Sequence, residues 1–136
     1  MEYDPMSPIW LQVVNRIKGS IATGAVGPGE KMPGGRDLAV QYSINPNTAA
    51  RVYQELERAG LCETRRGMGT YVTGDAERIA QLRKQMAADA AGRYLRDLEI
   101  LGLSRADAVR LLNEKEENEN ARKQGTDQEI RDEDRC

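Results

Sequence analysis

The feature that most constrains the fold of this chain is the stretch from Arg36 to Val72, RDLAVQYSINPNTAARVYQELERAGLCETRRGMGTYV. It has the pattern of a short amphipathic helix, a tight connection, a second helix and a hairpin, in that order. In the first helix, Leu38 and Ala39 lie four and three positions before Tyr42, which places these side chains on one face. The next two residues leave room only for a turn between adjacent helices.

The second predicted helix begins at Pro46 and ends before Gly60. Asn45 has a side chain suited to the N-cap, and Pro46 fits the first helical position, where its missing N–H costs nothing. Gly60 is the C′ residue that can turn left-handed and end the helix. Apolar residues at spacings of three and four predict a buried stripe of Ala49, Val52, Tyr53 and Leu56. The outer face is polar and consists of Asn47, Thr48, Arg51, Gln54, Glu55 and Arg58.

A hairpin follows this helix directly. Residues 61–65 and 70–72 are β-prone runs, and the tip between them contains Gly67 and Gly69. Glycine permits the positive φ of a tight turn and a close approach of the backbone to a phosphate. Arg65 and Arg66 add two permanent charges there. Taken alone, the tip is most simply a solvated turn with exposed arginines. Directly after a helix–turn–helix, contact with a sugar–phosphate backbone is the better interpretation.

These elements, in this order, predict a winged helix–turn–helix, a fold that places its second helix in the DNA major groove. Polar side chains at the start of that helix, namely Asn47, Thr48 and Arg51, are of the kind that contact base edges or phosphates. The sequence therefore predicts binding to double-stranded DNA rather than catalysis.

The run KMPGGRDLAVQYSINPNTAARVYQELERAGLCETRRGMGTYV resembles the N-terminal domain of the GntR family of bacterial transcription regulators, and the resemblance covers roughly residues 8–112. The NPNTAARVYQELE segment with a short C-terminal region is most similar to the YtrA-type branch. The resemblance implies DNA contacts by the residues that begin the two helices of the motif, which are Arg36, Asn45, Asn47, Thr48 and Arg51. It also implies that the wing tip, with Arg66, Gly67 and Gly69, lies along the minor groove.

The chain departs from the family pattern just before Arg36. The family usually has Pro-Ser there, with the serine capping the helix, whereas this chain has Pro33, Gly34 and Gly35. Glycine is an acceptable N-cap at a small cost, but a second glycine in the first turn loosens the helix.

The fold class expected is α+β, mainly α, in four segments. Residues 1–7 are predicted to be a flexible arm, and residues 8–74 to be the winged helix–turn–helix domain. Within it, Ser7-Pro8 starts a supporting helix that ends at Gly24, and a short strand at residues 31–32 lies against the wing. The apolar face of the supporting helix consists of Trp10, Val13, Ile17 and Ile21.

Residues 75–112 are predicted to form two helices separated at Gly102, the second opened by Ser104 and Asp107, which resemble a capping box. Two such helices cannot bury their apolar faces against each other alone, so they fold back on the first domain or pair with a second chain. We favour a symmetric homodimer, as the YtrA-type resemblance also implies. The residues expected at its interface are Leu82, Met86, Tyr94, Leu98, Leu101, Leu111 and Leu112. Residues 113–136 are charged, and we expect them to start as helix and become disordered.

The net charge of −2 does not argue against DNA binding, because the acidity is concentrated in the tail. Residues 113–136 contain nine acids and five bases, a net of −4, which leaves +2 on residues 1–112. Binding depends on the local patch that faces phosphate. The basic residues of the first domain expected to form that patch are Lys31, Arg36, Arg51, Arg58, Arg65 and Arg66.

Composition also narrows the function classes. The chain has no histidine, and two cysteines, Cys62 and Cys136, do not form a disulfide framework or a metal cluster, so we expect neither an enzyme nor a metal or cofactor. No run of 18 apolar residues and no signal pattern occurs, so we expect a cytoplasmic protein without a membrane partner. Two alternatives stay open. One is a winged-helix protein-interaction module without specific DNA binding, and the other is an additional, unidentified small-molecule effector at the dimer interface.

Overall fold

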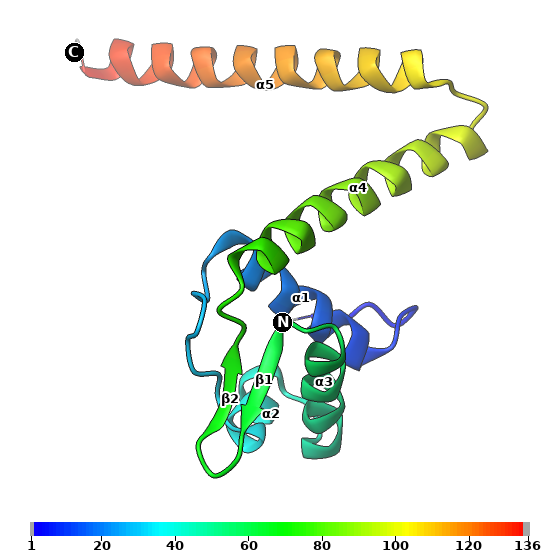
Figure 1. Ribbon diagram of the computed structural model, residues 1–136. Coiled ribbons are helices and arrows are strands. Elements are labelled where there is room, and N and C mark those ends of the chain that lie inside the picture. Colours follow the sequence, from blue (N-terminus) through cyan, green and yellow to red (C-terminus); the bar gives the residue numbers. More distant parts are fainter. Residues whose placement is uncertain (1, 135–136) are drawn as a thin grey trace. The chain divides into compact units, whose positions relative to one another are not determined.

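The computed structural model describes residues 2–134, with the side chains of residues 2–123 (Figure 1). The chain forms two compact units, one up to Ala87 and one from Ala88 onward. In chain order the elements are α1 (Ile9–Thr23), α2 (Gly35–Tyr42), α3 (Pro46–Arg58), β1 (Cys62–Arg65), β2 (Gly69–Val72), α4 (Ala76–Ile100) and α5 (Arg105–Asp134). This order confirms the predicted winged helix–turn–helix followed by a helical region.

The core of the first unit forms where α3 packs against α1 and α2. The predicted stripe of α3 is buried: Ala49, Val52 and Leu56 are fully covered, and Tyr53 is nearly so. From α1 the core receives Val13, Val14, Ile17 and Ile21. Trp10, which was expected on the same face, is half-buried and packs at the edge of this core.

Local signals set the ends of α3 as predicted. Asn45 is the N-cap, and its Oδ1 accepts a hydrogen bond of 2.8 Å from the backbone N–H of Asn47. Pro46 occupies the first turn, and Gly60 adopts φ 73° directly after the C-cap residue Ala59. A glycine is needed there because side chains rarely adopt a positive φ.

The wing is a two-stranded antiparallel hairpin in which Cys62 pairs with Val72 and Arg65 pairs with Gly69. The short strand predicted at residues 31–32 is also present, as a bridge between Lys31 and Tyr71. Backbone hydrogen bonds from Met32 N to Thr70 O (2.7 Å) and from Val72 N to Glu30 O (2.9 Å) complete it. These bonds tie the segment before α2 to the wing.

The N-terminal arm differs from the expected flexible segment. The hydroxyl of Tyr3 donates to the backbone oxygen of Tyr42 at the end of α2. Gln12 on α1 donates through Nε2 to the backbone oxygens of Asp4 (2.7 Å) and Ser7 (2.9 Å). Because the partner of Tyr3 is a backbone oxygen at the end of α2 and the partner of Asp4 and Ser7 is a side chain of α1, the pattern of residues 1–7 alone did not indicate these bonds.

The first turns of α4 belong to the first unit. Asp75 caps the helix through Oδ1, and Arg78 donates to the backbone oxygen of Ala59 from Nε (3.1 Å) and Nη2 (2.8 Å). Leu82 is 5% exposed within the core, and Met86 packs against it. Both side chains were expected at a dimer interface. Leu82 is covered within its own chain because α4 begins on the winged domain, which corrects the expectation for this residue. Met86 is only half-buried and stays a predicted interface residue.

In the second unit α4 ends as predicted. Gly102 has φ 76°, and the N–H of Leu103 donates to the backbone oxygen of Leu98 (3.0 Å). The capping box is formed in both directions: the Ser104 N–H donates to Asp107 Oδ2 (2.7 Å), and the Asp107 N–H donates to Ser104 Oγ (3.2 Å). The hydrogen bonds from Ser104 hold the pKa of Asp107 below its usual value.

Two more residues expected at a dimer interface pack within this unit. Leu98 is 9% exposed, and the half-buried Tyr94 donates through its hydroxyl to the backbone oxygen of Ala108 (3.0 Å). Leu98 is therefore a core residue of this unit, which corrects the expectation that a partner chain covers it. Leu101 and Leu112 remain exposed, and Leu111 is half-buried.

The charged segment after Leu112 starts as helix, as expected, but α5 continues to Asp134 where disorder was expected. Glutamate, lysine, arginine and glutamine are good helix formers, and Arg110 forms i,i+4 and i,i+3 pairs with Glu114 and Asp107. The low hydrophobicity of the segment indicated disorder, but hydrophobicity does not take the helix propensity of its charged residues into account. Residues 135–136, including Cys136, lie outside the described part.

Among the residues that the structure describes, no helix has the length and apolar character needed to span a membrane.

The bonds from Arg78 to the end of α3 should be measurable in stability. Arg78→Ala removes two charge-assisted hydrogen bonds to a C-terminal helix carbonyl, and we expect the free energy of unfolding to fall by about 1–2 kcal/mol. Urea denaturation measures it. Arg83→Ala, an exposed arginine one to two turns later on the same helix, is the control and should change stability by less than about 0.5 kcal/mol. Equal effects of the two substitutions would contradict a specific role for Arg78.

Candidate nucleic-acid interface

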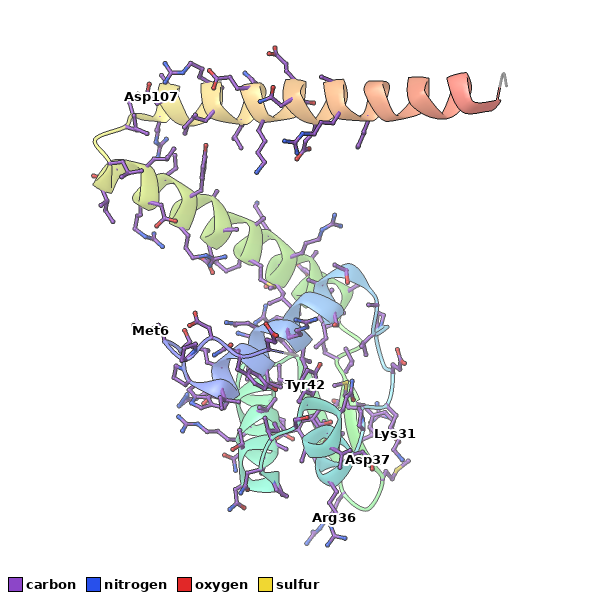
Figure 2. The ribbon with its side chains drawn as sticks, turned by 180° about the vertical axis from the view of Figure 1, so that it is seen from behind. Met6, Lys31, Arg36, Asp37, Tyr42 and Asp107 are labelled. Carbon is purple, nitrogen blue, oxygen red and sulfur yellow. The ribbon has the colours of Figure 1, made fainter. Side chains whose placement is uncertain are left out.

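Three candidate DNA-contacting elements lie at the same end of the first unit. Figure 1 shows that the first turn of α3 and the tip of the β1–β2 hairpin both lie at the lower end of this unit. Figure 2, turned by 180°, shows Arg36 at the start of α2 extending from that same end. The fold thus brings together residues that the sequence predicted separately.

The outer face of α3 is available for contact. Asn47 and Arg51 are exposed, as predicted, and Thr48 is half-buried. Asn45 uses its side-chain oxygen for the cap, so only its amide nitrogen can donate to an external group. Arg58, at the other end of the helix, forms an exposed ion pair with Glu55 at 3.5 Å. The N-terminal half of α3 is therefore the part that presents unshared donors.

Arg36 lies in the first turn of α2, after the two glycines that depart from the family pattern. Gly34 is the N-cap with extended backbone (φ −62°, ψ 164°), and it has no side-chain cap. The hydroxyl of Tyr53 on α3 donates to the backbone oxygen of Pro33 and so fixes the entry to α2 from the core side. Burial raises the pKa of the Tyr53 hydroxyl. This bond does not reach the N–H groups of the first turn of α2, so the start of the helix remains without a side-chain cap.

The wing tip combines two glycines with two arginines. Gly67 has φ 75° and Gly69 has φ 119°, and a Cβ at Gly69 would lie 3.0 Å from Lys31 Cε. Arg65 pairs with Glu63 at 2.9 Å and lies over the ring of Tyr71, 4.2 Å from its centroid. Arg65 is therefore partly engaged within the wing. Arg66, next to it, is exposed at the tip.

Electrostatics favour an anionic partner at this end. Within the described part of the chain, Arg36, Arg51 and Arg66 have no carboxylate within the 4.0 Å of an ion pair. No ion pair therefore occupies the donors of these three arginines, which can bind phosphate or base edges. No cluster of metal-ligating side chains occurs among the described residues. Cys62 is buried in β1, and burial raises its thiol pKa to about 11.

Comparison with known proteins agrees with this geometry. The family model "Bacterial regulatory proteins, gntR family" matches residues 10–72. The HTH-type transcriptional regulator YhcF of Bacillus subtilis is 33% identical over 108 residues, which cover 79% of this chain and 89% of that protein. The chain belongs to the GntR family. It is a DNA-binding transcription regulator with a winged helix–turn–helix.

Further relatives place this GntR-family regulator near the YtrA-type branch. The HTH-type transcriptional repressor YtrA of Bacillus subtilis is 42% identical over 79 residues, covering 57% of this chain and 61% of YtrA. A solved GntR family transcriptional regulator from Listeria monocytogenes superimposes with a TM-score of 0.77 at 32% identity, covering 82% of this chain and 98% of that one. These matches confirm the resemblance to YtrA-like members.

Two contacts that support the candidate interface were not predicted from the sequence. Trp10 was expected only in the core, yet its ring lies 4.1 Å from the guanidinium carbon of Arg51. Tyr53 was expected only as part of the apolar stripe, yet its hydroxyl holds Pro33. Both aromatic residues follow the apolar spacing of their helices. Their contact partners, Arg51 and Pro33, belong to other parts of the chain, so spacing alone could not reveal these contacts.

The uncapped start of α2 gives a testable prediction. Gly34→Ser should raise the free energy of unfolding by about 0.5–1 kcal/mol, because serine adds an N-cap acceptor and stiffens the unfolded chain. The backbone of Gly34 suits any residue, and no atom lies within 4 Å of an added Cβ. Thermal unfolding measures the gain, and Gly34→Ala is the control that lacks the hydroxyl. If Gly34→Ser stabilised the protein no more than Gly34→Ala, the serine hydroxyl would not act as an N-cap and the prediction would be wrong.

Proposed function

We propose that this GntR-family regulator binds an inverted-repeat operator as a homodimer and represses transcription by occluding the promoter. The observation that carries the proposal is the two-sided character of α3. One face of this helix is buried in the core, and the N-terminal half of its opposite face presents exposed polar side chains at the end of the unit where the wing tip lies. A helix of this kind is suited to a major groove.

The roles proposed for the residues follow from their positions. Asn47, Thr48 and Arg51 contact base edges or nearby phosphates from α3. Arg36 contacts the backbone from the start of α2, where its charge adds to the positive helix N-terminus. At the wing tip Arg66 contacts the sugar–phosphate backbone, with Arg65 secondary because it is shared with Glu63. Gly67 and Gly69 let the wing backbone approach the minor groove closely.

The proposed dimer is supported by exposed apolar side chains in the second unit. They lie at the end of α4 and on the first turns of α5, and they are Ile100 (84% exposed), Leu101 (71%), Val109 (59%) and Leu112 (56%). Ile100 and Val109 add to the residues predicted from the sequence. A group of large apolar side chains left in water is typical of an interaction surface. For the proposed two-fold dimer we expect operator half-sites about one helical turn, ~34 Å, apart.

Repression is proposed because the relative YtrA is named a repressor and because the fold offers a DNA-covering surface. As its ligand is chromosomal DNA, we propose that the protein acts in the cytoplasm. A promoter-reporter strain from which the gene is deleted should show raised transcription of the controlled promoter, and lowered transcription would contradict repression.

Salt dependence tests the DNA contacts without knowledge of the operator. For a random-sequence duplex, contact with about six phosphates predicts a slope of log affinity against log salt near −5. Arg66→Ala should weaken binding to all duplexes alike and reduce the slope by about 1 for each bound protomer. Fluorescence anisotropy between about 50 and 200 mM salt measures both. Arg83→Ala is the control. If no duplex binds even at low salt, a winged-helix protein-interaction module becomes the better function.

The dimer is tested by placing a charge on the exposed apolar surface. Leu101→Asp and Leu112→Asp should convert the dimer to a monomer, because an unpaired carboxylate would be buried between the chains. Sedimentation velocity measures the mass. Val40→Asp is the matched control, since Val40 is also exposed (79%) but lies on α2. A mass unchanged by both leucine substitutions would place the interface elsewhere.

A further inference from the structure

One arginine of α3 is supported by an aromatic ring from another helix. The guanidinium carbon of Arg51 lies 4.1 Å from the centroid of the Trp10 ring. Trp10 is the second residue of α1, is half-buried and packs against the core, whereas Arg51 is exposed. Because α1 and α3 pack against each other, the core fixes the ring and the ring fixes the arginine.

The stacking leaves the binding capacity of the arginine intact. The N–H donors of a guanidinium lie in its plane, so a ring against one face does not use them. Within the described residues no carboxylate lies within 4.0 Å of Arg51 to compete for these donors. Trp10 therefore restricts where Arg51 points and leaves its edge free for the acceptors of a base or a phosphate.

We propose that Trp10 is a positioning residue for sequence discrimination, which holds Arg51 in the orientation that contacts a base edge. The inference rests on the proposed function of α3 as the DNA-contacting helix. A long side chain loses rotamer freedom when it binds, and a stacked arginine has lost part of that freedom before DNA arrives. The supporting helix α1 thus contributes to specificity although it does not enter the groove.

The wing provides an internal comparison. Arg65 lies over the ring of Tyr71 at a similar distance, 4.2 Å, but it also pairs with Glu63 at 2.9 Å. Its donors are shared with a carboxylate, and it lies at the hairpin tip rather than on α3. Loss of the Tyr71 ring should therefore weaken binding to all sequences alike, whereas loss of the Trp10 ring should reduce discrimination between sequences.

The test uses two duplexes of equal length, the one most enriched by the protein from a random pool and one of random sequence. Trp10→Leu should lower the ratio of the two affinities about threefold to tenfold, because the stacking that orients Arg51 is lost. Trp10→Phe keeps a ring and should keep most of the ratio. Tyr71→Leu should leave the ratio unchanged. In an Arg51→Ala background, Trp10→Leu should have no further effect on the ratio.

A second measurement remains available if Trp10→Leu does not fold. Trp10 is the sole tryptophan of the sequence, so its fluorescence reports on the stacking directly. Arg51→Ala should alter its emission in the DNA-free protein, and unchanged emission would overturn the proposal. A wild-type ratio near one would overturn the proposed function and this role with it. A normal wild-type ratio that Trp10→Leu leaves unchanged or raises would overturn the role of Trp10 alone.

Discussion

The structure depends on the burial of one face of α3. Val52 and Leu56 are fully covered by α1, α2 and the wing strand, and each such side chain contributes about 1.5–3 kcal/mol through the apolar surface removed from water. Because the apolar stripe faces the core, the polar face of α3 must point outward. The same burial therefore stabilises the domain and presents Asn47 and Arg51 to a partner.

Other contacts set the position of the interface elements relative to this core. The Tyr53 hydroxyl, from the inner face of α3, holds the segment before α2 and thus the start of the helix that carries Arg36. The bridge between Lys31 and Tyr71 ties that segment to the wing. Arg78 binds the C-terminal end of α3 from the first turn of α4. Each element that is proposed to meet DNA is thus fixed by a bond to a neighbouring element.

Local chemistry explains what the sequence could predict. The ends of α3 were predictable because Asn45, Pro46 and Gly60 determine the backbone conformation of residues next to them in the sequence. The capping box between Ser104 and Asp107 is equally local. The stacking of Arg51 on Trp10 and the docking of Tyr3 were not predictable, since their partners are distant in the chain. Apolar periodicity along α4 shows which face of the helix is apolar, but it does not show which element covers that face. Leu82 and Leu98 were therefore expected at a partner chain, whereas each is buried within its own unit.

The most direct test of sequence-specific binding is selection of duplexes from a random pool by the wild-type protein, followed by sequencing of the bound fraction. The proposed arrangement predicts enrichment of an inverted repeat whose half-site centres are about one helical turn, ~34 Å, apart, because a two-fold dimer presents two α3 helices at that spacing. The same selection with Asn47→Ala should lose preference at specific positions of each half-site. A pool that remains random after repeated rounds would contradict the assignment of α3 as a helix that recognises DNA sequence.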